Sequence, residues 1–179
     1  MDATPKTSSG QNLPEIVLGN SNRRFSGITS TLLQVLPHQI DMARIVVLGV
    51  HHLPQSTPRI GFFKLVKVLR SRDADGQTVI FHARRNDEMI QALILKRLVH
   101  CRLKILFTST AQRYHSGFTR WLMRQMDSVI STCSAAASYL PAQPDTLIPH
   151  GVDAARYQPR SMIEGREASE QLSHRKHIG

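Results

Sequence analysis

Short apolar runs recur along this chain, and apolar residues return with a helical period in the stretches between them. The runs are rich in β-branched residues and do not alternate with polar ones, which is typical of strands buried on both faces of a sheet. The predicted strands span residues 15–18, 43–50, 78–81, 103–107, 128–130 and 146–148.

The stretches between these strands have the pattern of amphipathic helices. In the first, Ile28, Leu32 and Leu36 share one face, and Ser26 or Thr29 is the expected N-cap. Further helices are predicted over residues 58–70, 86–99, 118–126 and 133–140. Because strands and helices alternate throughout, the pattern predicts an α/β fold with a Rossmann-like, doubly wound parallel sheet.

The two ends of the chain lack this alternation. Residues 1–14 are polar and residues 160–179 have no clear apolar period, so we expect a disordered leader and a loose tail around one domain of residues 15–159. No apolar run approaches the ~20 residues of a spanning helix, and no signal peptide is evident. The expected location is the cytoplasm, which is compatible with binding to the surface of a membrane.

The net charge and the cysteine content favour some classes of partner but do not select a single one. The formal net charge is +10 over 179 residues, which favours nucleic acid, acidic lipid headgroups or phosphorylated sugars. Cys101 and Cys133 are the only cysteines and form no metal-binding pattern, so we expect free thiols and no metal site. The fingerprints of dinucleotide binding, of phosphate-binding loops and of the serine nucleophile elbow are absent.

The stretch T-V-I-F-H-A-R-R-N-D-E-M at residues 78–89 holds the strongest candidate chemistry. Ligands of open parallel sheets sit beyond the carboxyl ends of the strands. There His82 could bond a sugar hydroxyl or relay a proton, or it could be satisfied by neighbouring backbone. Arg84 and Arg85 could clamp a carboxylate or phosphate, or lie as a solvated surface pair. The residue pattern leaves both pairs of alternatives open.

Other strand and helix ends offer weaker candidates. Gly27, just before a helix, could let backbone amides approach an anion or could be an ordinary turn glycine. Ser109 and Thr110 follow another strand and are candidate contacts for substrate hydroxyls. Each signal is weak by itself.

Two longer motifs resemble a known family. The segment T-L-I-P-H-G-V-D-A-A-R-Y-Q-P is similar to the I-P-N-G-V-D-x-x-x-F-x-P junction of family-4 retaining glycosyltransferases, which have the two-domain GT-B fold. The segment M-D-S-V-I-S-T-C-S resembles that family's D-x-V-I-A-x-S strand and helix. The resemblance covers residues 15–159 and implies the N-terminal, acceptor-side domain, with His150, Gly151 and Asp153 at the inter-domain junction.

Within that family, F-H-A-R-R-N-D-E-M, L-K-I-L-F-T-S-T-A-Q-R and R-R-F-S-G-I-T-S-T are most similar to lipopolysaccharide core mannosyltransferases. This resemblance implies transfer of mannose from GDP-mannose to a Kdo-bearing lipid A core at the inner membrane, with no further cofactor and no nucleic acid. It implies that His82 is the catalytic-site histidine that contacts the transferred sugar. It also places Arg23, Arg24, Arg84 and Arg85 near the carboxylates and phosphates of the acceptor.

One departure from the family is large. The donor-binding second domain has no counterpart after Pro159, so we expect a truncated enzyme with little activity alone. A fragment left by a frameshift or early stop is compatible with this interpretation. The alternative function is a non-enzymatic module that binds anionic lipid or nucleic acid through its arginines.

Overall fold

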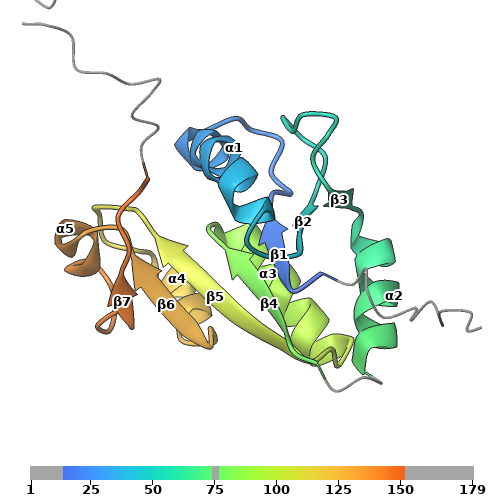
Figure 1. Ribbon diagram of the computed structural model, residues 1–179. Coiled ribbons are helices and arrows are strands. Elements are labelled where there is room, and N and C mark those ends of the chain that lie inside the picture. The colour runs from blue at the N-terminus through green and yellow to red at the C-terminus, as the bar shows by residue number, and fades with distance from the viewer. Residues whose placement is uncertain (1–13, 74–76, 152–179) are drawn as a thin grey trace, which may run out of the picture.

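A computed structural model describes residues 14–73 and 77–151 of the chain. Within them, seven parallel strands form one sheet flanked by helices (Figure 1), which confirms the predicted α/β, Rossmann-like fold. Most of the predicted leader, the tail at 160–179 and the domain limit at 159 lie outside the described residues, so the predictions made for them stay predictions.

The elements follow one another as the alternating pattern predicts. The strands are β1 Ile16–Gly19, β2 Ile45–Leu48, β3 Arg59–Ile60, β4 Val79–Ala83, β5 Leu103–Ser109, β6 Ser128–Ser131 and β7 Thr146–Leu147. The helices are α1 Gly27–Ile40, α2 Phe62–Asp73, α3 Asn86–Leu93, its π-helical continuation η1 Ile94–Leu98, α4 Gly117–Met123 and α5 Ser134–Ala137.

The strand order is β3-β2-β1-β4-β5-β6-β7. From β1 the chain builds outward to β3, then returns and places β4 on the other side of β1. The order therefore reverses between β1 and β4, and in open α/β sheets the carboxyl end of such a reversal is where ligands bind. Strand β4, which carries His82, is one of the two strands at this point.

The two faces of the sheet are covered unequally. On one face Val17, Phe81 and Ile105 are fully buried in a core with residues of α2, α3 and α4. On the other, Leu18 and Val47 pack in a smaller core with Leu32 and Leu36 of α1. Among the described residues no helix covers the β4 and β5 part of this second face (Figure 1). Ile80 is 41% exposed there.

Several boundaries differ from those predicted. Strand β4 continues through His82 and Ala83, so His82 is a strand residue rather than the residue after a strand. The short strand β3 was not predicted, and α2 begins at Phe62 rather than at residue 58. Pro37 lies inside α1. The N-cap of α3 is Arg85, and Asn86 Nδ2 donates to Thr119 Oγ1 at 2.8 Å.

Two glycines let segments approach closely at the carboxyl edge. A Cβ on Gly19, the last residue of β1, would lie 2.7–2.9 Å from three carbons of Glu88. Gly49, just after β2, has φ +125°, and a Cβ there would lie 2.2 Å from the carbonyl oxygen of Asn20. A side chain at either position would force the backbone or Glu88 to move.

Candidate functional site

Two adjoining cavities open at the carboxyl edge of the sheet, between α1, the ends of β4 and β5, and the segment after β7. The first has a volume of about 370 Å³ and the second about 150 Å³. Arg84, Thr108 and His150 line both cavities. The predicted site residues Gly27 and Thr110 line the first, and His82 and Gly151 line the second. The fold thus gathers these predicted positions around one concave site.

His82 is half-buried on the sheet face that α1 partly covers. Its Nε2 atom lies 2.7 Å from Oγ1 of Thr108, which belongs to the neighbouring strand β5. Burial, together with the positive charge of Arg84, lowers the pKa of His82 to about 4. The imidazole is therefore neutral at physiological pH, and a neutral ring has one nitrogen that donates and one that accepts.

Arg84 and Glu88 connect the ends of the two strands at the reversal. The backbone N–H of Arg84 donates to Oε2 of Glu88 at 2.7 Å, and Arg84 Nη2 donates to the carbonyl oxygen of Gly19 at 2.7 Å. Glu88 is fully buried, and burial raises its pKa to about 7 against the opposing effect of the Arg84 charge. Burial also lowers the pKa of Arg84. Arg84 Nε and Glu88 Oε1 are buried without a hydrogen-bond partner among the described residues.

Arg85 points toward the start of α1. Its Nη2 donates to Ser26 Oγ at 2.6 Å and to Thr29 Oγ1 at 3.0 Å. Ser26 is the N-cap of α1 as predicted, but its side chain makes no capping hydrogen bond. Arg85 therefore fixes the helix start that forms one side of the larger cavity.

The remaining predicted residues lie apart from the cavities. Arg23 and Arg24 are exposed in the loop after β1 and line neither cavity. Ser109 is buried, and its Oγ lies 3.5 Å from Nε2 of His115. Asp153 lies outside the described residues.

The sequence analysis missed two polar residues of the site, Thr108 and Glu88. Side chains alternate along a strand, and Thr108 has the same parity on β5 as Leu106, the register partner of His82. This alternation would have placed Thr108 on the same face as His82 if the predicted strand had extended beyond residue 107. Glu88 falls in the first turn of the helix predicted over residues 86–99, where acids are common, and nothing in the local sequence indicates its burial.

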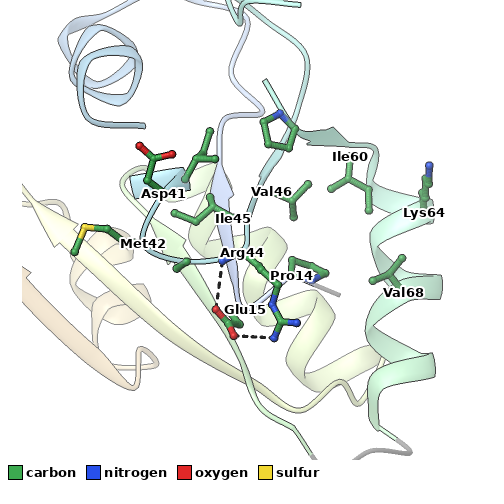
Figure 2. Close-up of a pocket in the computed structure, with 13 residues that line it drawn as sticks. Pro14, Glu15, Asp41, Met42, Arg44, Ile45, Val46, Ile60, Lys64 and Val68 are labelled. Atoms are coloured by element: carbon green, nitrogen blue, oxygen red, sulfur yellow. Dashed lines mark hydrogen bonds and ion pairs between the residues drawn. The ribbon is translucent and has the colours of Figure 1, made fainter. Parts of the chain in front are cut away.

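A third cavity lies at the opposite, amino edge of the sheet and has a volume of about 670 Å³ (Figure 2). Its lining is largely apolar, with Ile45, Val46 and Ile60 from the strands, and Glu15 bonds Arg44 at its rim. None of the predicted site residues lines it. Within residues 14–73 and 77–151, no group of three or more His, Cys, Asp or Glu side chains could hold a metal ion.

Sequence comparison finds that the chain is similar to a known group of enzymes. The chain is 40% identical over 166 residues to the lipopolysaccharide core biosynthesis mannosyltransferase LpcC of Rhizobium leguminosarum bv. viciae, a match of 92% of this chain and 46% of LpcC. It is 41% identical over 146 residues to the similarly named LpsB of Rhizobium meliloti (strain 1021), covering 81% of this chain and 41% of LpsB. By sequence the chain is related to lipopolysaccharide core glycosyltransferases.

The glycosyltransferase resemblance predicted from the motifs is thereby confirmed. No protein-family model matches the chain. The chain spans less than half the length of each of these glycosyltransferase relatives. The similarity therefore concerns the part of each relative that aligns with this chain.

Proposed function

We propose that this domain is the acceptor-side half of a glycosyltransferase that moves mannose from GDP-mannose to the Kdo-bearing lipid A core in lipopolysaccharide biosynthesis. The observation that carries the proposal is the position of His82, which lies at the strand-order reversal of a Rossmann-like sheet in a chain related to enzymes of that name.

A neutral His82 suits sugar transfer in which positive charge develops on the transferred sugar. A protonated imidazole would oppose that charge, whereas a neutral one can bond a sugar hydroxyl without adding a cation. The lowered pKa keeps the ring neutral. Thr108 orients one ring nitrogen by its contact with Nε2 and leaves the other for the ligand.

Arg84 supplies positive charge beside His82. It lines both cavities and lies beside His82, so a phosphate or carboxylate of either substrate can be held there. The net charge of +10 adds long-range attraction for an anionic acceptor. Arg23 and Arg24 fit this broader role on the exposed loop after β1.

The donor-binding half is expected from a second domain, in the same polypeptide or another. Transfer needs donor phosphate and acceptor hydroxyl held together, and positioning contributes a large part of catalysis. We therefore expect the 179-residue chain alone to bind acceptor and to turn over GDP-mannose slowly if at all. The proposed place of action is the cytoplasmic face of the inner membrane. No described helix is long and apolar enough to cross a membrane.

The experiment is a pair of measurements on the chain as it is. Binding of a delipidated Kdo-containing core saccharide is followed by NMR of the histidine side chains, in wild type, His82→Ala and the exposed control His38→Ala. Mannose transfer is assayed alongside a complete relative. We expect saccharide binding that His82→Ala weakens about tenfold or more, because a buried hydrogen bond is lost, and that His38→Ala leaves intact.

Three outcomes would contradict parts of the proposal. Equal saccharide binding by wild type and His82→Ala would remove His82 from the site. Tight binding of RNA or of saccharide-free anionic vesicles, with no saccharide binding, would favour the non-enzymatic module. Turnover close to that of the complete relative would contradict the need for a second domain.

A further inference from the structure

The outer face of α4 exposes large aromatic side chains. Phe118 is 54% exposed and Trp121 50% exposed, and their rings stack with centroids 6.0 Å apart and planes at 19°. The helix is anchored by its opposite face, where Leu122 and Met123 are buried in the main core. The aromatic pair is therefore presented outward on a fixed helix and does not contribute to the described core.

Positive charge surrounds this pair. Arg120 and Arg124 lie on the same helix or at its C-cap and are exposed. With a period of 3.6 residues, Trp121 and Arg124 project away from the core, with Phe118 and Arg120 on either side of them. We call these four residues the α4 outer surface. Residues 110–126 contain no aspartate or glutamate, so no acid of this segment neutralises it.

The helix that carries the α4 outer surface begins close to the carboxyl edge of the sheet, the edge at which the candidate site lies. Strand β5 ends at Ser109 on the carboxyl edge, and α4 begins at Gly117 after a short loop from that edge (Figure 1). The aromatic pair belongs to the first turns of the helix. Thr119, between the two aromatics, is bonded by Asn86 of α3, which follows directly after Arg84 and Arg85. The surface is thus fixed to the same β4–α3 corner that carries the site arginines.

We propose that the α4 outer surface docks this protein on an anionic lipid bilayer. Tryptophan and phenylalanine partition into the boundary between headgroups and acyl chains, and arginines beside them attract acidic headgroups. This inference rests on the proposed function, because a lipid-linked acceptor is presented at a bilayer surface. Nucleic acid is the less favoured partner, because a convex helix face offers no groove along which a strand could run.

The chain carries its own reporter for this contact. Trp121 is its single tryptophan, so the intrinsic tryptophan emission comes from the proposed surface alone. The protein is titrated with phosphatidylcholine vesicles, with vesicles that also contain phosphatidylglycerol, and with an RNA oligonucleotide. We expect a blue shift with the anionic vesicles, quenching by brominated acyl chains, and reversal of the shift by high salt. These vesicles hold no saccharide, so the result does not depend on sugar transfer.

Variants separate this surface from general positive charge. Arg120→Gln/Arg124→Gln should weaken binding about 30-fold, because each cation near an anionic surface contributes roughly fivefold to the affinity. The matched control, Lys67→Gln/Arg70→Gln on the exposed side of α2, removes the same charge and should change binding much less. For Phe118→Ser the vesicle affinity should fall about tenfold, since apolar burial is lost. Circular dichroism confirms that each variant is folded.

The outcomes decide between the partners. The proposal is supported by a blue shift with anionic vesicles whose affinity falls strongly in the α4 variants and little in the α2 variant, even if no saccharide binds. Vesicle binding without a change in Trp121 emission, or equal losses from the α4 and α2 variants, would overturn it. So would a Trp121 response to RNA at affinities above those for vesicles.

Discussion

His82 and Thr108 contact each other across neighbouring strands although they are not register partners. His82 pairs with Leu106 in the β4–β5 ladder, and Thr108 lies two positions further along β5 on the same face. The Nε2–Oγ1 distance is 2.7 Å. This diagonal contact orients the imidazole toward the carboxyl edge of the sheet, where the two cavities lie.

The first prediction concerns this contact. Thr108→Val keeps the shape of the side chain but removes the hydroxyl, which leaves Nε2 of His82 without this partner in a half-buried position. Such a loss destabilises a protein by about 1–3 kcal/mol. Chemical denaturation should show this decrease in the free energy of unfolding. We also expect a changed NMR shift of the His82 ring nitrogens and weaker saccharide binding. Thr132→Val, at another threonine of the smaller cavity, is the control. An unchanged His82 spectrum in Thr108→Val would contradict the assignment.

The sequence predicted the sheet well because its signals are local. Apolar runs and helical periods are read from neighbouring residues, and β1, β2, β4, β5, β6 and β7 were all placed near their actual limits. Strand β3, Arg59–Ile60, was not predicted because two residues are too few to show a pattern of apolar and polar positions. The strand order could not be read from the sequence, since it depends on contacts between distant segments.

The buried polar contacts of the site could not be predicted from local sequence patterns either, because they also join distant segments. Glu88 looks like an ordinary first-turn acid, yet it is fully buried against Gly19, far away in the sequence. Arg85 looks like a surface arginine, yet it bonds the start of α1. His82 and Arg84 were found because they follow an apolar run at a strand end, which is a local signal.

The second prediction concerns the close approach of backbone segments at the carboxyl edge. Gly49→Ala should destabilise the fold by roughly 1–3 kcal/mol or more, because Gly49 has φ +125° and an added Cβ would meet Asn20 at 2.2 Å. Gly61→Ala is the matched control, since a Cβ there meets nothing within 4 Å. Thermal unfolding followed by circular dichroism compares them. Equal midpoints would mean that the two loops do not touch as described.

The third prediction concerns Arg85. One guanidinium nitrogen, Nη2, donates to both Ser26 and Thr29, and its two N–H groups are fixed in the guanidinium plane, whereas a lysine ammonium sits on a flexible stem and is more strongly hydrated. Arg85→Lys should therefore lower the free energy of unfolding by about 1–2 kcal/mol and increase amide exchange at the start of α1. Arg24→Lys, at an exposed position of the preceding loop, should do neither. Unchanged exchange in Arg85→Lys would show that this arginine does not hold the helix.

The last prediction concerns the pH dependence of stability, in which His82 and Glu88 act in opposite directions. The pKa of His82 falls from 6.5 to about 4 on folding, so stability from this group is lost as pH falls from 6.5 to 4. The pKa of Glu88 rises from 4.5 to about 7, so stability from this group is lost as pH rises from 4.5 to 7. Each shift corresponds to about 3 kcal/mol at most, and the two nearly cancel over the shared range.

Single variants should separate the two opposing pH dependences of the free energy of unfolding. Urea unfolding of wild type and Glu88→Gln between pH 4 and 8 should give a stability difference that grows in favour of the variant as pH rises, because glutamine has no charge to desolvate. For His82→Gln the difference should grow in favour of the variant as pH falls, because the variant has no imidazole to keep neutral. His38→Gln, at an exposed histidine of α1, controls for the loss of an imidazole elsewhere. Curves for both site variants that run parallel to wild type would contradict the two shifted pKa values, whereas opposite slopes would show that folding keeps the His82 imidazole neutral and raises the pKa of the Glu88 carboxyl.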